Sequence, residues 1–160
     1  MTFYEKVGKA LAGADKWPYT YNSLLLNIMK ISASIKSSYN QQETVVQTND
    51  SAKEMQITTK PSGFGSSING GELLLLALAT CFCNDIYREA TKRNLTVSGV
   101  EVLVTGEFGA DGEPGSNFTY KASVSSDAPP AEIDALIRHT DQIAEIHNTL
   151  RQGLSITLAM

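Results

Sequence analysis

The two cysteines are the residues of this chain whose chemistry is most versatile. Cys81 and Cys83 end the run Leu-Leu-Leu-Leu-Ala-Leu-Ala-Thr-Cys-Phe-Cys, which carries no charged side chain. In a helix, positions i and i+2 point to different sides, so these thiols are not expected to form a disulfide with each other. One interpretation is that both fill a core, because free cysteine is among the most buried residue types. The other is a nucleophile, which requires a thiolate, nearby positive charge or a donor, and a path to the surface.

Other kinds of reactive site find little support in the sequence. The chain has two histidines, His139 and His147, and no His-x-x-x-His or Cys-x-x-Cys spacing, so no zinc site is expected. His139 falls off the apolar stripe of its predicted helix and is expected in solvent, whereas His147 lies on the stripe and is expected in the core. The glycine-rich segment 61–71 lacks both the lysine of a P-loop and the last glycine of the dinucleotide fingerprint. We therefore expect neither a cofactor nor a metal.

The element that must position the thiols is a helix predicted over residues 69–93. Asn69 and Glu72 have the spacing of a capping box, in which each side chain bonds the other's backbone amide. Residues 73–83 are apolar all round, which predicts burial on every side. This run is too short to span a bilayer, so no membrane segment is expected. After Cys83 the pattern becomes amphipathic, and the helix is expected to emerge into water with Glu89 paired to Arg93.

The remaining elements are predicted from periodicity and turn residues. Apolar and β-branched residues alternate over 31–35, 44–48 and 55–59, which predicts a three-stranded meander. Two longer strands, 97–108 and 118–125, flank a glycine-rich hairpin loop. A second helix begins at Pro129-Pro130 and is expected to run unbroken through Ala144, and alternation over 154–158 predicts a last strand. The predicted order is βββ-α-ββ-α-β, an α+β fold with antiparallel sheet around a central buried helix.

Composition limits the classes of partner. With 160 residues the chain is expected to form one domain over residues 28–160, preceded by an N-terminal leader at 1–27. Its 17 Asp and Glu residues exceed its 13 Lys and Arg residues, so the basic surface typical of nucleic-acid binding is not expected. Two cysteines that cannot pair, and no apolar signal segment after the first charged residues, favour a reducing cytoplasm.

The segment Asn69-Gly-Gly-Glu-Leu-Leu-Leu-Leu-Ala-Leu-Ala-Thr-Cys-Phe resembles the signature of the OsmC/Ohr family, the osmotically inducible and organic hydroperoxide resistance proteins. The element order and the tail Ile-His-Asn-Thr-Leu-Arg are also similar to this family, over about residues 28–160. The resemblance implies an intertwined homodimer with its sites at the interface. It also implies that Cys81 is the peroxidatic cysteine, which attacks the peroxide oxygen.

The other catalytic residues of the family do not carry over. The resolving cysteine falls at Ala144 and the proline after it at Glu145, while the catalytic glutamate falls at Gly71. The family also uses an arginine from the N-terminal strand region, and this chain has no arginine before Arg88. Lys30 or Lys36 could replace its charge but not its rigid bidentate geometry.

Three residues of the chain could support Cys81. They are Arg88, two turns further along the same helix face, Glu72 and His147. Asp85 is expected to compete for Arg88 as an i,i+3 partner.

Two hypotheses follow from these residues. In the first, Cys81 reduces small organic hydroperoxides in an oxidative-stress response, with an external thiol as reductant. In the second, the chain is a non-catalytic dimeric protein that binds an apolar small molecule. The pKa of the Cys81 thiol would distinguish the two, since a catalytic cysteine titrates well below about 8.5.

Overall fold

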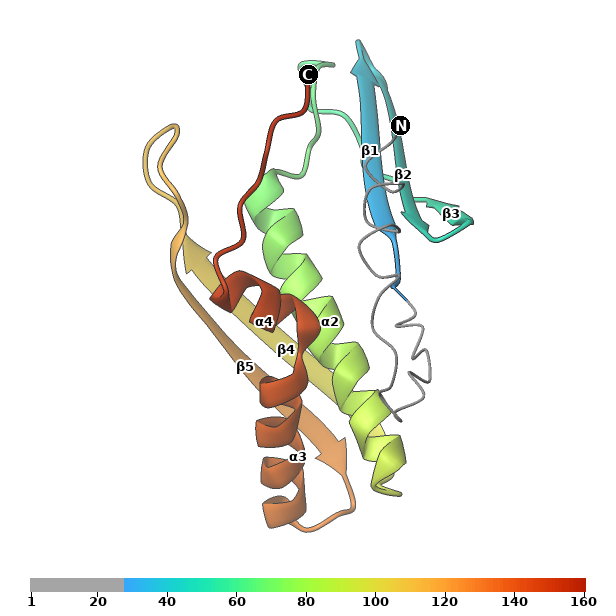
Figure 1. The fold of residues 1–160 in the computed structure, drawn as a ribbon, viewed down its shortest axis with the longest axis vertical. Coiled ribbons are helices and arrows are strands. Elements are labelled where there is room, and N and C mark those ends of the chain that lie inside the picture. Colours follow the sequence, from blue (N-terminus) through green and yellow to red (C-terminus); the bar gives the residue numbers. More distant parts are fainter. Residues whose placement is uncertain (1–27) are drawn as a thin grey trace, which may run out of the picture.

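The computed structural model describes residues 28–160, and the predicted leader at 1–27 lies outside the described residues. The elements, labelled as in Figure 1, are β1 (Ile31–Ser38), β2 (Gln41–Thr48), β3 (Ser51–Glu54), α2 (Gly70–Lys92), β4 (Val97–Glu107), β5 (Ser116–Ser126), α3 (Pro130–Ile143) and α4 (Glu145–Arg151). The α+β class is confirmed. The strands form two antiparallel sheets, β1-β2-β3 and β4-β5.

The first sheet is a meander with tight turns. Asn40 and Asn49 adopt left-handed backbone conformations, with φ of 54° and 51°, which asparagine tolerates better than most residues. Because the second turn is only two residues long, pairing with β2 begins at once at Ser51. The strand predicted at 55–59 is therefore wrong in position: β3 ends at Glu54, and Thr59 makes only an isolated bridge to Ser66.

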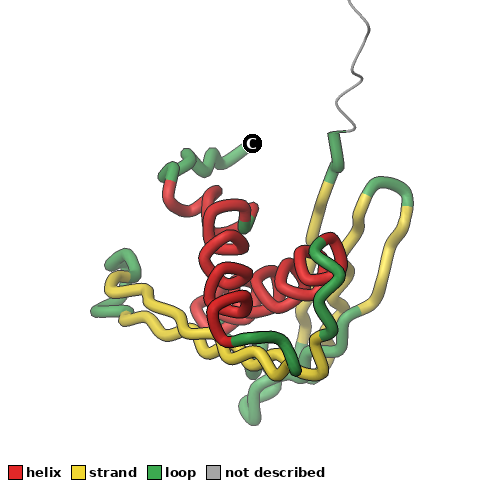
Figure 2. The backbone as a smooth tube through the Cα atoms, turned by 90° about the horizontal axis from the view of Figure 1, so that it is seen from below, coloured by secondary structure: helices red, strands yellow, loops and turns green. Residues whose placement is uncertain are grey.

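The second sheet carries the helices. Strands β4 and β5 pair over almost their whole length, from Val97 opposite Ser126 to Glu107 opposite Ser116. Helix α2 packs on β4, and α3 and α4 pack on α2. Figure 2 shows the helices on one side of this hairpin, with the three-stranded sheet rising separately beside them.

The buried part of α2 is not the part that the sequence predicts. The core cluster is Phe82, Ile86, Ala90, Leu136 and Ala144, packed against residues of β4, β5 and α3. The second half of α2 is thus buried, whereas Leu76 in its apolar first half is 56 % exposed. The expectation of burial on every side is wrong for the single chain because no residue of β1, β2 or β3 joins this core.

The second helix is broken, which contradicts the prediction of an unbroken run through Ala144. That residue has an extended conformation (φ −64°, ψ 106°), so α3 ends at Ile143 and α4 begins at Glu145. Two side chains of α4 bind carbonyls that the break leaves without helical partners. Asn148 Nδ2 donates to the Gln142 carbonyl at 3.0 Å, and Arg151 Nη1 donates to the Asp141 carbonyl at 3.0 Å. These bonds and the complete burial of Ala144 stabilise a break without proline.

The C-terminal residues do not form the predicted strand. Residues 154–160 have no regular structure, and Ile156 is fully exposed. A strand needs a neighbour for its backbone hydrogen bonds, and no described strand pairs with this segment in the single chain. The alternation of Leu154, Ile156 and Leu158 therefore has no partner here.

By length and composition alone, α2 could cross a membrane. Core helices of soluble proteins pass the same test. In this chain α2 packs against β4, α3 and α4 and buries two carboxylates, Asp85 and Glu89. Those contacts are the ones expected of a core helix.

Candidate functional site

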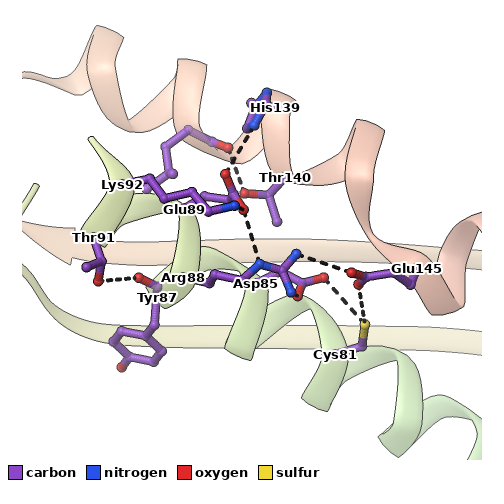
Figure 3. A network of polar contacts seen from close by, with 11 residues as sticks. Cys81, Asp85, Tyr87, Arg88, Glu89, Thr91, Lys92, His139, Thr140 and Glu145 are labelled. Carbon is purple, nitrogen blue, oxygen red and sulfur yellow. Dashed lines mark hydrogen bonds and ion pairs between the residues drawn. The ribbon is translucent and has the colours of Figure 1, made fainter. Parts of the chain in front are cut away.

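The thiol of Cys81 lies where α2 meets the start of α4 (Figure 3). The break at Ala144 turns α4 so that its first residues face Cys81, and the Ile146 backbone amide is near enough to the sulfur to lower the pKa of the thiol. The residue is half-buried, as is Cys83, and both thiols are free. The Cys81 sulfur therefore combines a backbone donor with partial access to solvent.

Two carboxylates approach the same sulfur from different helices. Asp85, one turn along α2, has its Oδ2 3.4 Å from Cys81 Sγ, and Glu145 Oε2 lies 4.0 Å away. Asp85 is buried, whereas the Glu145 side chain is 64 % exposed. The thiol is thus positioned to donate its proton to Asp85, and a thiolate would lie next to two negative charges.

Arg88 holds these carboxylates together. Its Nη1 lies 2.8 Å from Asp85 Oδ1, its Nη2 lies 3.5 Å from Glu145 Oε1, and its Nε lies 3.1 Å from Glu89 Oε1. The predicted competition is confirmed, since the partners of the guanidinium are Asp85, Glu89 and Glu145 and not Cys81. Arg88 therefore acts on the sulfur through the carboxylates between them.

The electrostatic balance keeps Cys81 protonated. Burial raises the pKa of the Cys81 thiol, the Ile146 amide lowers it, and the charges of Asp85 and Glu145 raise it further. The pKa of Asp85 is raised by its burial, against the lowering effect of its hydrogen bond from Cys81. The net direction for the thiol is upward from its ordinary value, opposite to that of an activated cysteine.

Behind Arg88 lies a second set of ion pairs. Glu89 Oε1 lies 2.7 Å from Lys92 Nζ, and Glu89 Oε2 lies 3.3 Å from His139 Nε2. The hydrogen bond from Lys92 is the largest cause that lowers the pKa of Glu89 to about 2. The predicted Glu89–Arg93 pair is wrong because Lys92, three residues on, binds Glu89 instead. His139, expected in solvent, contacts Glu89 and is half-buried.

Glu72 does not reach the thiol in the structure. It completes the predicted capping box, with Asn69 N donating to Glu72 Oε2 at 2.8 Å and Glu72 N donating to Asn69 Oδ1 at 2.9 Å. The lysines considered as substitutes are also elsewhere: Lys36 pairs with Glu43 on β2, and Lys30 bonds Asn49 through its backbone. Among the described residues, Arg88 is the cation nearest to this site by its ion pairs.

His147 is buried in the core, as predicted, with 5 % of its surface exposed. Its ring packs against Tyr120 and Phe82, with centroid separations of 4.7 and 5.5 Å. It does not bond to Cys81, and neither ring nitrogen has a hydrogen-bond partner among the described residues. Burial and the charge of Arg151 lower the pKa of His147, so its imidazole is neutral near pH 7.

The two carboxylate contacts of Cys81 were not predicted from the sequence. Asp85 is four residues after Cys81, a spacing that places both on one helix face. Glu145 could not have been placed without the helix break, which follows from tertiary packing. The signals that could have indicated the break are Asn148 and Arg151, whose side chains reach back to α3.

The cluster also has the donor types of a cation site. The sulfur of Cys81 and carboxylate oxygens of Asp85 and Glu145 all lie within 4.8 Å of one another. Arg88 already binds both carboxylates, so its positive charge occupies the role that a metal ion would have. We assign no metal to this cluster.

Comparisons with known proteins agree on one family. The model of OsmC-like proteins matches residues 63–159. An OsmC-like protein from Mycoplasma pneumoniae is similar in structure, with a TM-score of 0.54 and 22 % identity over 79 % of this chain and 89 % of that one. No curated protein matches the sequence significantly.

Two further solved structures share the fold. A candidate organic hydroperoxide resistance protein from Vibrio cholerae, with captopril bound in one of its active sites, has a TM-score of 0.54 and 21 % identity over 82 % of this chain and 91 % of that one. A candidate osmotic stress induced and detoxification response protein from Psychrobacter arcticus has a TM-score of 0.55 and 17 % identity, over 73 % and 85 % respectively. Identities this low establish the fold alone.

Proposed function

This chain belongs to the OsmC-like protein family. From its site we propose that the protein is a slow thiol peroxidase for small organic hydroperoxides, with Cys81 as the nucleophile. The observation that carries the proposal is the position of the sulfur between a proton acceptor and a backbone donor. Asp85 Oδ2 lies 3.4 Å away, and the Ile146 amide at the start of α4 lowers the pKa of the thiol. Similar structures described as hydroperoxide resistance proteins support the substrate class.

The reaction can be written with its atoms in balance. The thiol proton passes to Asp85, and the sulfur attacks the terminal oxygen of the hydroperoxide, whose O–O bond breaks. The alkoxide takes a proton and leaves as an alcohol, and Cys81 becomes a sulfenic acid. An external thiol then forms a mixed disulfide and releases water. A second external thiol restores Cys81 and leaves as a disulfide.

Asp85 and Arg88 have separate roles in this proposal. Asp85 is the general base because its Oδ2 is the carboxylate oxygen nearest to the sulfur. Arg88 is a positioning residue, since its Nη1 holds the other oxygen of Asp85 at 2.8 Å. The Ile146 amide would stabilise the developing thiolate, while Glu145 opposes it.

The expected rate is low, and the cycle needs an outside reductant. The thiol pKa is raised, so the thiolate fraction near pH 7 is small, and each further unit reduces it about tenfold. Ala144 stands where a resolving cysteine would be, and Cys83 lies two residues from Cys81 on the same helix. The sulfenic acid must therefore react with a small thiol or oxidise further.

The test is peroxide consumption with a dithiol reductant. We expect the wild-type protein to reduce an organic hydroperoxide slowly, Cys81→Ser to abolish turnover, and the matched control Cys83→Ser to retain it. Equal turnover by the wild-type protein and Cys81→Ser would contradict the proposal. So would loss of turnover in Cys83→Ser with Cys81 intact.

A second candidate function is non-catalytic binding of an apolar small molecule. It is favoured by the raised pKa of the Cys81 thiol. Burial and the two carboxylates raise that pKa, and a protonated thiol is a poor nucleophile. The matching observation in solution would be ligand binding that Cys81→Ser leaves unchanged, together with no peroxide turnover.

We propose further that the working unit is a homodimer. In the single chain the whole of β1 is exposed, and so are Leu76, Leu154, Ile156 and Leu158. Such apolar surface is typical of an obligate interface, which buries well over about 2,000 Å². A monomer in sedimentation at micromolar concentration would refute the dimer.

A reducing compartment, the cytoplasm, suits a cycle that depends on small thiols.

A further inference from the structure

The structure contains a small cavity whose lining does not include Cys81. Its volume is about 150 Å³, and it lies between α2, the β4–β5 sheet and α4. Leu78 and His147, both buried, form its inner end, and Phe118 and Leu150, both partly exposed, stand at its mouth. Most of the lining is therefore aliphatic or aromatic.

The one buried polar ring at this cavity has unmet hydrogen-bonding capacity. Both nitrogens of His147 are buried without a partner among the described residues. The neighbouring polar groups are already engaged: Tyr120 donates its hydroxyl to Asp141, and Thr119 Oγ1 bonds Thr105 Oγ1 at 2.8 Å. A buried polar group without a hydrogen-bond partner is costly and rare in folded proteins. We therefore expect the imidazole to bind a partner that is not part of the chain.

We propose that this cavity binds a neutral single-ring aromatic compound with one hydroxyl group, of the phenol class, which hydrogen-bonds to His147. Size supports this class, because an apolar cavity of about 150 Å³ accommodates a molecule like benzene. The aromatic lining supports it too, since Phe118 and Tyr120 offer ring contacts to an aromatic guest. A neutral imidazole accepts a hydrogen bond from a hydroxyl at one nitrogen, whereas an ionic guest would lose its hydration in the cavity.

The charges around His147 favour a neutral guest. Asp85 on α2, Asp141 on α3 and Arg151 on α4 act on the ring, with the two acids opposing the arginine. Arg151 and Asp141 form an ion pair with each other. An anionic guest would have to compete with Asp141 for Arg151. The site does not depend on Cys81, so it stands whether or not the thiol is a peroxidase.

The experiment compares phenol and benzene on the full-length protein. Isothermal titration should give phenol an affinity about three- to tenfold higher than that of benzene, the usual range for one added hydrogen bond. His147→Phe keeps an aromatic ring on Phe82 and Tyr120 and should remove this preference while benzene still binds. Val104→Phe, which fills the cavity from β4, should abolish both, and Cys81→Ser should change neither.

A measurement on the wild-type protein removes dependence on any variant's folding. The ¹⁵N resonances of the His147 imidazole should shift on addition of phenol and remain unshifted with benzene. Equal affinity for phenol and benzene would overturn the proposal, as would phenol binding that His147→Phe leaves intact. If the ¹⁵N resonances of the His147 imidazole do not shift at saturating phenol, the partner of the ring is a buried water and the proposal is wrong.

Discussion

Replacing Asp85 with asparagine should lower the pKa of the Cys81 thiol. Asparagine keeps the shape of the side chain and its place beside Arg88, but it removes the negative charge nearest to the sulfur, 3.4 Å away. It also replaces a charged hydrogen-bond acceptor, which favours the protonated thiol, with a weaker neutral one. Arg88 would then share its charge between Glu89 and Glu145. All of these changes favour the thiolate.

The size of the shift follows from the distance. At 3.4 Å two unit charges repel by about 1.2 kcal/mol in bulk water and by about 5 kcal/mol at an effective dielectric constant of about 20. Since about 1.36 kcal/mol corresponds to one pKa unit, Asp85→Asn should lower the thiol pKa by at least about one unit. Glu145→Gln, at 4.0 Å and exposed, should lower it by less, about 0.8 unit at the bulk-water dielectric constant.

The assay is the pH dependence of iodoacetamide alkylation, measured in a Cys83→Ser background so that one thiol reports. The midpoint should be lowest for Asp85→Asn, intermediate for Glu145→Gln and highest for the parent protein. Raising the salt to about 1 M should shrink the Glu145 effect more than the Asp85 effect, because exposed charges are screened more than buried ones. An unchanged or higher midpoint in Asp85→Asn would refute the electrostatic account of the site.

Three further results are expected. The unfolding free energy should fall as pH drops below about 6.5, because the unfolded chain then binds a proton that buried His147, with its lowered pKa, resists. His147→Phe should flatten that slope in urea melts, and an unaltered slope would count against this reading. Peroxide treatment should give sulfinic acid or mixed-disulfide adducts at Cys81 by mass spectrometry, whereas rapid formation of a Cys81–Cys83 disulfide would show that the helix geometry is wrong. Phe82→Ala should cost about 3–5 kcal/mol in denaturant unfolding, since the ring is fully buried, and a loss below about 1 kcal/mol would contradict the assigned core.

The parts of the fold that local signals encode could be predicted from the sequence. The capping box of Asn69 and Glu72 marks the start of α2, and alternation finds β4 and β5 almost to the residue. A turn over Asn49, Asp50 and Ser51 could be predicted from residue types, but the structure has a two-residue turn with Ser51 already paired in β3, and that register could not be predicted. Which half of α2 is buried could not be predicted, because burial depends on where β4, α3 and α4 dock.

The candidate site was predictable only in part. Cys81 was identified through the resemblance of its helix to a known family, and the competition of Asp85 for Arg88 through helical spacing. The positions of Glu145 and the Ile146 amide near the sulfur could not be predicted. Both depend on the helix break at Ala144, which has no proline to indicate it. The sequence therefore singled out Cys81 as the candidate nucleophile, which stays a prediction, and missed the groups that set the charge of its thiol.

The break at Ala144 has a consequence for the order in which the chain folds. Nothing in the local sequence forbids a helix there, so a peptide covering Pro130–Arg151 in isolation should show helix straight through Ala144. The bend then forms only when this segment docks and Ala144 enters the cluster with Phe82 and Leu136. Loosening that cluster by mutation should let the segment straighten and withdraw the Ile146 amide from the sulfur. The reactivity of the Cys81 thiol would then measure how tightly the core around Ala144 is packed. It could be used to follow the docking of the Pro130–Arg151 segment late in folding.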